Sequence, residues 1–233
     1  MSSVVKALAC GVAIFVVGFG PEARASTLTI DAAVVGGPTV HLTPTLTEVS
    51  SGVFASSDHV TQDGFFDLSW NIQLQGDPMI SGSFSLTNLS GITQTFSLTA
   101  TMGGVPPIPG ATLMGGSFGD VTYTDLNSDR IVMVVGSPFY QAQIDGVGVQ
   151  NFGALNLGPL SGVAPKQSWG VPIPSAPGPG VATSIGVAFP GFSLTAHDQV
   201  QTPFDFEVVV PEPASASLLG MGLVALVVAA RRR

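Results

Sequence analysis

The stretch Phe66-Asp67-Leu68-Ser69-Trp70-Asn71-Ile72-Gln73-Leu74-Gln75 alternates apolar and polar residues through all its positions. Successive side chains of a β-strand point to opposite faces of a sheet, so this alternation puts every apolar side chain on one face and every polar one on the other. The pattern predicts a strand that covers a core with one face and meets water with the other. Trp70 falls on the core face, where a structural role is expected.

The same period of two extends along the N-terminal half of the chain. Residues 27–30 predict an early strand, and 40–43 and 46–49, which flank Pro44, predict one edge strand or two short ones, because proline cannot donate to a central ladder. Residues 80–88 and 92–102 predict two strands joined as a hairpin. The tetrapeptide Phe-Ser-Leu-Thr occurs at 84–87, 96–99 and 192–195. The unequal spacing of these copies favours ordinary strand chemistry over a repeated binding unit.

The C-terminal half continues the pattern around one long irregular segment. Strands are predicted at 118–124 and 131–135 as a hairpin, twice within 140–157, and at 184–189, 192–196 and 204–210. Residues 158–180 hold six prolines and five glycines, which predicts one long loop. Roughly ten to twelve strands without a helical period predict an all-β domain at 26–210, a two-sheet β-sandwich of jelly-roll kind. A closed barrel is the alternative.

The N-terminus carries a predicted signal peptide at residues 1–25. Lys6 precedes an apolar run at 7–19, and the small residues Ala23 and Ala25 fit cleavage just before Ser26. The apolar run is too short for a retained membrane span. Cys10 precedes most of this run, which argues against a lipoprotein. We therefore expect the Sec translocon and signal peptidase as partners in export.

The C-terminus carries a second targeting segment at 211–233. Pro211, Glu212 and Pro213 precede seventeen uncharged residues at 214–230, and three arginines follow, Arg231, Arg232 and Arg233. A helix of that length spans about 25 Å, slightly less than the bilayer core of roughly 30 Å, so a single transmembrane helix is predicted at 214–230. The arginines favour the cytoplasmic side, which leaves the domain outside.

Together these three parts of the tail resemble the PEP-CTERM sorting signal of Gram-negative bacteria. The resemblance implies that an exosortase-type transpeptidase removes the helix near Pro211-Glu212-Pro213, after an inner-membrane intermediate. It also implies a setting at the cell surface or outside the cell, since such signals accompany exopolysaccharide systems. The alternative is an ordinary C-terminal membrane anchor. The resemblance is confined to the tail.

The composition of 26–210 limits the function classes. This segment has thirteen acidic residues and only two basic ones, Arg130 and Lys166, which gives a net charge of −11. Such a surface repels nucleic acids and anionic lipid, so no nucleic-acid partner is expected. The single cysteine, Cys10, lies in the signal, which leaves the mature domain without a disulfide or a cysteine metal site.

Two motifs resemble functional sites. Residues 115–119 read Gly-Gly-Ser-Phe-Gly and match Gly-x-Ser-x-Gly, but a predicted strand follows instead of the helix that a nucleophile elbow requires. A glycine-rich turn is the better interpretation. Asp125, Asn127 and Asp129 resemble the start of a calcium loop, although Arg130 occupies the position of the EF-hand glycine. A non-EF calcium site there is the one cofactor hypothesis, and a polar turn is its alternative.

The remaining candidate residues are histidines and one tryptophan. His41, His59 and His197 show no metal-binding spacing. His59 follows Ser57-Asp58, but adjacent residues on a strand face opposite ways, so this adjacency gives no catalytic triad and predicts surface positions. Trp169 either exposes a platform for sugar rings or packs under its own loop. No catalytic residue is predicted.

Three function classes remain open. The leading one is an exported, surface-sorted structural or adhesive protein associated with extracellular polysaccharide or a biofilm matrix. The second is a carbohydrate-binding module, which a surface row of aromatic residues would favour. The third is an enzyme of unrecognised type, which a pocket with a histidine and two carboxylates would favour.

Overall fold

The computed structural model describes residues 26–76, 78–108, 110, 112–115, 119–124, 138–152, 166–169 and 173–209. These residues form fifteen β-strands in two antiparallel sheets and no helix. The signal peptide at 1–25 and the tail at 211–233 lie outside the described residues. The all-β prediction is therefore confirmed for the domain, while the predicted signal peptide and transmembrane helix stay predictions.

The smaller sheet has six strands in the order β11-β10-β14-β7-β1-β2. Its strands are β11 (Val147–Phe152), β10 (Tyr140–Ile144), β14 (Ser184–Leu194), β7 (Gln94–Gly103), β1 (Thr27–Val34) and β2 (Thr39–Leu42). The larger sheet has nine, with the central order β12-β9-β15-β6-β5-β4-β3; off this path, β8 pairs with β15 and β13 pairs with β8. Its strands are β12 (Lys166–Trp169), β9 (Gly119–Thr124), β15 (Gln199–Val209), β6 (Met79–Asn88), β5 (Phe66–Gln75), β4 (Val53–Gln62), β3 (Thr47–Ser50), β8 (Thr112–Gly115) and β13 (Ile173–Pro177).

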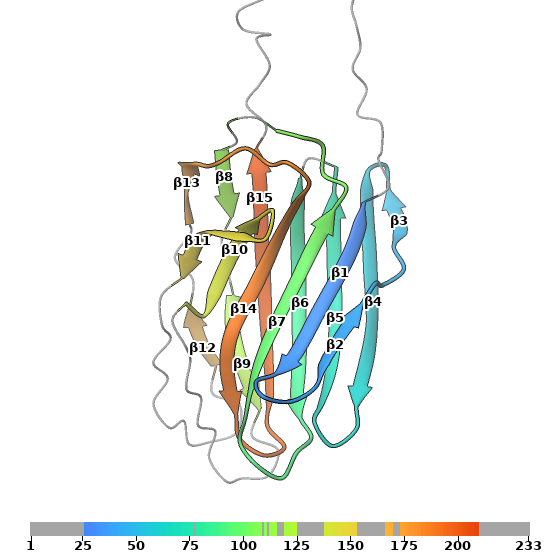
Figure 1. Cartoon of the computed structure of the whole chain (residues 1–233), viewed down its shortest axis with the longest axis vertical. Coiled ribbons are helices and arrows are strands. Elements are labelled where there is room, and N and C mark those ends of the chain that lie inside the picture. The colour runs from blue at the N-terminus through green and yellow to red at the C-terminus, as the bar shows by residue number, and fades with distance from the viewer. Residues whose placement is uncertain are drawn as a thin grey trace, which may run out of the picture.

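The two sheets pack face to face and enclose one core (Figure 1). In β5, the five apolar residues that the sequence places on one face are all buried, while Asn71 and Gln73 on the other face are exposed. Two separate sheets with free edges confirm the sandwich over the barrel. The jelly-roll connections stay a prediction, because two of the links between strands run through 125–137 and 153–165, outside the described residues.

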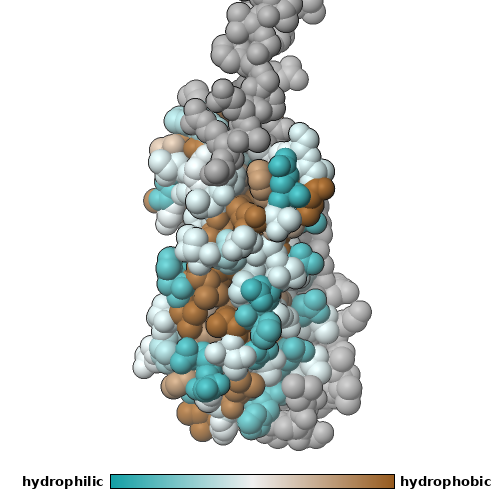
Figure 2. Space-filling model, turned by 90° about the vertical axis from the view of Figure 1, so that its right-hand side faces the viewer, coloured by the Kyte–Doolittle hydropathy of each residue, from teal (hydrophilic) through white to brown (hydrophobic). Residues whose placement is uncertain are grey.

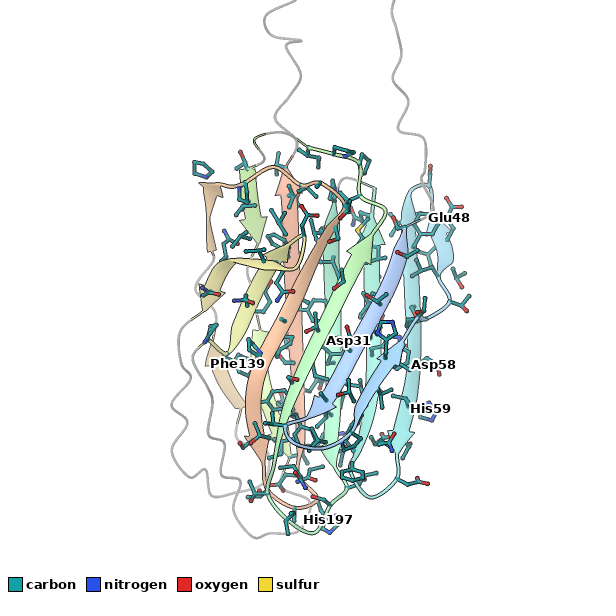
Figure 3. All side chains as sticks on the ribbon, in the orientation of Figure 1. Asp31, Glu48, Asp58, His59, Phe139 and His197 are labelled. Carbon is teal, nitrogen blue, oxygen red and sulfur yellow. The ribbon has the colours of Figure 1, made fainter. Side chains whose placement is uncertain are left out.

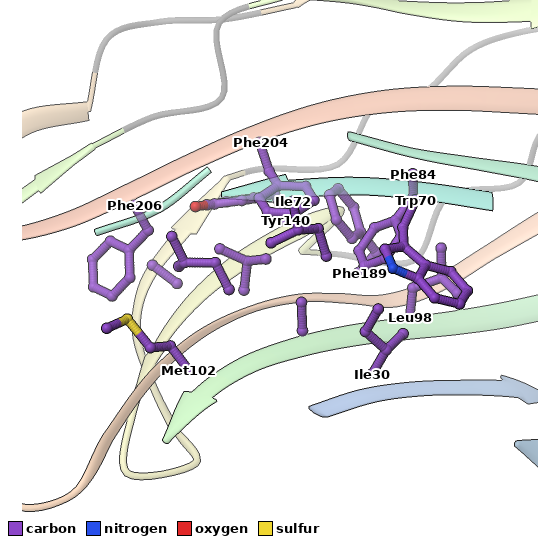
Figure 4. Close-up of a cluster of buried hydrophobic side chains, with 14 of the residues drawn as sticks. Ile30, Trp70, Ile72, Phe84, Leu98, Met102, Tyr140, Phe189, Phe204 and Phe206 are labelled. Atoms are coloured by element: carbon purple, nitrogen blue, oxygen red, sulfur yellow. The ribbon is translucent and has the colours of Figure 1, made fainter. Parts of the chain in front are cut away.

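Aromatic rings from both sheets meet in the middle of the core (Figure 4). Phe189 of the smaller sheet lies 6.2 Å from Phe84 and 6.3 Å from Phe204 of the larger sheet, measured between ring centroids. The ring of Tyr140 stands 5.7 Å from Phe189 at an interplanar angle of 73°. Edge-to-face pairs of this kind add to the free energy gained by burial. The domain is therefore stabilised by packing, in agreement with the absence of cysteine from 26–210.

The predicted hairpin between 80–88 and 92–102 is wrong. β6 and β7 belong to different sheets, so their connection crosses the end of the sandwich. Asn88 is fully buried there, and its amide nitrogen donates to the carbonyl oxygens of Ile92 at 2.9 Å and Leu194 at 3.0 Å. Its side-chain oxygen accepts from the backbone N–H and the hydroxyl of Ser90. A buried asparagine satisfied in this way ties the β6–β7 connection to the β14–β15 turn.

Several strand boundaries also differ from the sequence prediction. β2 and β3 are two short strands on either side of Pro44, and they form edges of opposite sheets. β12 and β13 lie inside 158–180, where the sequence predicts a loop; their four and five residues are edge pairings that proline and glycine content does not prevent. The predicted strands at 184–189 and 192–196 form one strand, β14, with a bulge between Phe189 and Phe192.

Strand β15 contains a proline although it lies within the larger sheet. On one side β15 pairs with β9 at residues 199–201 and with β8 at residues 206–209. Pro203 falls between these two partners, where its missing N–H costs no ladder hydrogen bond. The Tyr140 hydroxyl crosses from the smaller sheet and donates to the carbonyl oxygen of Asp205 at 2.9 Å in the same gap. One inter-sheet hydrogen bond thus satisfies a carbonyl at this break in the sheet.

The lateral edge formed by β2, β3 and β4 is incompletely closed. Apolar side chains gather in a band between the two sheets there, flanked by polar ones (Figure 2). The partly buried side chains that pack against the core from β2, β4 and the β2–β3 connection are Val40, Leu42, Leu46, Phe54 and Val60. The start of β1 at Thr27 and the end of β15 at Val209 lie together at one end of the sandwich (Figure 1).

Candidate polar binding site on the larger sheet

The outer face of the larger sheet carries rows of small polar side chains. In register across β4, β5, β6 and β15, one row reads His59, Ser69, Ser85 and Gln201. A second row reads Ser57, Asn71 and Ser83, and ends at Pro203. The alternation that buries the apolar half of each strand brings these polar halves together on the solvent side. Serine hydroxyls and the amides of Asn71 and Gln201 therefore make up most of these two rows.

Residues of these two rows line an open depression with a volume of about 680 Å³. Ser69, Ser83 and Ser85 are small side chains at its centre, while His59 on β4 and Gln201 on β15 are larger and stand at its sides. Trp70 also contributes to the lining, but only 6% of it is exposed and its indole N–H donates to Ser56 at 3.1 Å. Trp70 therefore supports the floor from the core side and offers no stacking platform, as the alternation predicts.

A histidine and two carboxylates line this depression. Asp58 and His59 are each 70% exposed, with 3.8 Å between the Asp58 carboxylate and His59 Nδ1. The Asp58 carboxylate accepts the backbone N–H of His59 at 2.8 Å, and the Asp67 carboxylate accepts the Thr61 hydroxyl at 2.7 Å. Both carboxylates thus bind neighbours within the β4–β5 pair. Figure 3 shows Asp58 and His59 on β4, at the open edge of the sandwich.

The three histidines lie on three different elements of the fold. His41 lies on β2 at the edge of the smaller sheet, where its Nδ1 is 2.5 Å from the Asp31 carboxylate. His197 lies in the β14–β15 turn with a positive φ of 61°, at one end of the sandwich (Figure 3). Within the described residues, no group of three or more His, Cys, Asp or Glu side chains is arranged to hold a metal ion.

Asp145 forms a carboxylate site that the sequence prediction missed. It occupies the β10–β11 turn with φ of 49° and is followed by Gly146 with φ of 77°. Its carboxylate accepts the backbone N–H groups of Ala182, Thr183 and Ser184 at 2.8–2.9 Å, and the Thr183 hydroxyl at 3.0 Å. Desolvation raises its pKa, but these hydrogen bonds together outweigh it and hold the pKa below the usual value. In the sequence, the pair Asp145-Gly146 indicates a turn, but it does not indicate which residues hydrogen-bond to the carboxylate.

Asp205 shows the opposite behaviour on the outer face of β15. Burial raises its pKa, and the charge of Glu207 raises it further. Its Oδ1 is buried without a hydrogen-bond partner among the residues that the structure describes. Burial, together with the Asp205 charge, also raises the pKa of Tyr140, so its hydroxyl stays protonated and donates to the Asp205 carbonyl. The role of Tyr140 is therefore structural, because its hydroxyl forms a hydrogen bond between the two sheets.

Most of the sites proposed from the sequence fall outside what the structure describes. Asp125, Asn127 and Asp129, the calcium hypothesis, lie outside the described residues, as do the sorting residues Pro211, Glu212 and Pro213 and the cluster Arg231, Arg232 and Arg233. Of the signal cleavage residues, only Ser26 is described. The backbone of Trp169 pairs with Gly119 between β12 and β9, and its side chain is outside the described part. β9 begins at Gly119, so a strand follows the Gly-x-Ser-x-Gly motif, as predicted.

Comparison with known proteins identifies the tail alone. The family model of the PEP-CTERM protein-sorting motif matches residues 209–233, which confirms the predicted resemblance. No curated protein matches the chain. The motif indicates an exported protein sorted to the cell surface of a Gram-negative bacterium, with an exosortase-type enzyme as its processing partner. Among the described residues no helix is long and apolar enough to span a membrane.

Proposed function

We propose that this chain is a structural or adhesive surface protein that associates with extracellular polysaccharide in a biofilm matrix. The observation that carries the proposal is the sorting motif at 209–233, which begins at the last residue of β15. The sorted domain therefore ends where the tail begins, without an intervening linker. After sorting, the sandwich would remain directly beside its point of attachment.

The chemistry of the domain supports this setting. A disulfide-free β-sandwich with a closely packed aromatic core keeps its stability independent of the redox state outside the cell. The outer face of the larger sheet offers hydroxyl and amide groups, the groups with which hydrated polysaccharides form hydrogen bonds. With a net charge of −11 over 26–210, the domain repels polyanions and stays soluble.

The proposed processing has two cuts. Signal peptidase removes residues 1–25 after Sec-dependent export, and the sorting enzyme later removes the helix at 214–230 from an inner-membrane intermediate. Arg231, Arg232 and Arg233 hold that intermediate in orientation by remaining in the cytoplasm.

Intact mass spectrometry of protein recovered from the native cell surface tests the proposal, with and without the sorting enzyme. We expect a product that begins at Ser26, ends near Pro211-Glu212-Pro213 and carries added mass. A product that retains Arg233 in wild-type cells would make this an ordinary tail-anchored protein and contradict the proposal. Co-fractionation with matrix polysaccharide, lost on deletion of 211–233, tests the adhesive part.

A second candidate is an enzyme, because Asp58, His59 and Asp67 line the same depression. Their interactions favour binding over catalysis: Asp58 accepts a backbone N–H, Asp67 accepts the Thr61 hydroxyl, and the depression is open to water. General acid–base catalysis needs groups aimed at one reacting atom. Sugar binding at Trp169 and calcium binding at Asp125, Asn127 and Asp129 are two further hypotheses, each testable by substitution.

A further inference from the structure

The depression on the outer face owes its shape to the size of neighbouring side chains. Ser69 and Ser85 are a cross-strand pair on β5 and β6, and they lie between His59 on β4 and Gln201 on β15 in one row. β4 and β15 are three strand spacings apart, or about 14 Å. The depression therefore lies over β5 and β6, between His59 and Gln201, with serine side chains on its floor.

The lining combines hydrogen-bond donors and acceptors, and the serines on its floor are uncharged. Serine hydroxyls donate and accept, and the amides of Asn71 and Gln201 supply both functions. A polyhydroxylated chain also donates and accepts at every unit. The lining is therefore complementary to a ligand rich in hydroxyl groups.

Charge narrows the ligand class further. Asp58 and Asp67 line the depression, and no Lys or Arg does so among the described residues. The whole predicted mature domain carries a net charge of −11. A polymer of uronates or sulfates would meet like charge at every unit, which costs affinity and slows association. An uncharged polymer meets no such barrier.

The binding must be weak per site and must strengthen with polymer length. None of the outward-facing described residues of β4, β5, β6 and β15 is Phe, Tyr or Trp, so no stacking supplements the hydrogen bonds. Each new hydrogen bond replaces one with water and therefore adds little net free energy. Several molecules on one long polymer, or several units sampled by one site, compensate through avidity.

From these observations we infer that the depression over β5 and β6 binds a neutral, hydroxyl-rich polysaccharide. The inference rests on the proposed function and gives it a ligand class and a site. It also differs from the Trp169 hypothesis, because it places recognition in hydrogen-bonding side chains on the sheet face.

Affinity electrophoresis tests the inference, with processed protein recovered from the cell surface. The gels contain dextran, pullulan or galactomannan as neutral probes, chitosan as an amine-bearing probe and alginate as a carboxylate-bearing probe. We expect retardation by at least one neutral probe, none by alginate, and at least fivefold weaker apparent binding of an oligosaccharide than of the parent polymer.

Two variants locate the site. Ser69→Gln/Ser85→Gln fills the floor while keeping it polar, and it should abolish retardation. The matched control is Thr29→Gln/Thr101→Gln, a cross-strand pair on the outer face of the smaller sheet, which should bind as wild type does. Thermal melts verify that both variants fold. If the floor variant does not fold, Ser69→Ala/Ser85→Ala, which removes only the two hydroxyls, replaces it and should weaken retardation.

Three outcomes would overturn the inference. These are no retardation by any neutral probe, equal retardation of the folded floor variant and the control, and retardation by chitosan alone. The last would assign binding to the carboxylates. Cell fractionation distinguishes failure of this binding site from failure of the proposed function. If the floor variant stays with matrix polysaccharide in cells, the site is wrong and the matrix role stands; if wild type itself does not co-fractionate, the proposed function fails.

Discussion

The two faces of the sheet region formed by β4, β5, β6 and β15 share a backbone but differ in the surroundings of their side chains. On the inner face Phe84 and Phe204 contact rings of the opposite sheet, and each is almost completely buried. On the outer face Ser69 and Ser85 border an open depression and are partly exposed. Because alternate residues are separated by the sheet itself, the inner set determines stability and the outer set is available for recognition. Substitutions on the two faces should therefore separate these two properties.

The largest expected effect comes from the inner face at Phe189, which touches rings from both sheets. Phe189→Ala removes a fully buried ring and leaves a cavity, so the free energy of unfolding should fall by about 3–5 kcal/mol. Denaturant titration measures this, with Phe189→Leu as a control that should cost about 1–1.5 kcal/mol. A loss under about 1 kcal/mol for the alanine variant would mean that this cluster does not control stability.

Asn88 tests whether the ends of the sandwich matter as much as its middle. Asn88→Ala removes the side-chain donor from the carbonyls of Leu194 and Thr195 and one of the two side-chain donors of the Ile92 carbonyl. It should cost about 2–3 kcal/mol. Ser90→Ala removes a single hydroxyl from the same group and should cost about 1 kcal/mol. Equal costs for the two variants, measured by denaturant titration, would show that Asn88 is not the centre of this network.

Tyr140 isolates one inter-sheet hydrogen bond from ring packing. Tyr140→Phe keeps the ring against Phe189 but leaves the Asp205 carbonyl unpaired at the gap beside Pro203, so it should cost about 1 kcal/mol. Differential scanning calorimetry measures the shift in Tm. No shift would indicate that water replaces the hydroxyl in the gap.

Two carboxylates should give opposite pH dependences of stability. The pKa of Asp145 is lowered on folding, so its contribution is present above the unfolded pKa and is lost as pH falls through the folded pKa. The pKa of Asp205 is raised, so stability falls as pH rises from the unfolded pKa through the folded one. At neutral pH Asp145→Asn should lower Tm and Asp205→Asn should raise it, each by less than the Tyr140 effect. Thermal melts of both variants between about pH 3 and 7, the range in which carboxylates titrate, test these predictions. Changes in Tm of the same sign for the two variants would contradict them.

The smallest effect is expected on the outer face. Ser69→Gln/Ser85→Gln should change the free energy of unfolding by at most about 0.5 kcal/mol, because both side chains border solvent. The same variant should lose polysaccharide retardation. A destabilisation of 2 kcal/mol or more, on the scale of a core substitution, would break the comparison between the two faces and make the serines structural.

The sequence predicted strands well where only one face is apolar and poorly elsewhere. β5 was predictable because its alternation is unbroken, whereas β4 is polar on both faces over Ser57, Asp58 and His59 and gives no such pattern. The β6–β7 connection was predicted as a hairpin because turn residues do not encode which sheet the next strand joins. The depression could not be predicted either, since it depends on register between β4, β5, β6 and β15.

The sequence by itself determined the targeting tail, the all-β class and the buried half of the clearest strands, because these follow from local composition and a period of two. Only the tertiary structure decided which polar halves lie side by side, where β15 divides between β8 and β9, and how Asp145 and Asn88 find their partners. These depend on contacts between residues distant in the chain, as in the hydrogen bonds from Asn88 to Leu194 and from Thr183 to Asp145. Strand pairing and sheet packing fix such contacts, and no local pattern records them.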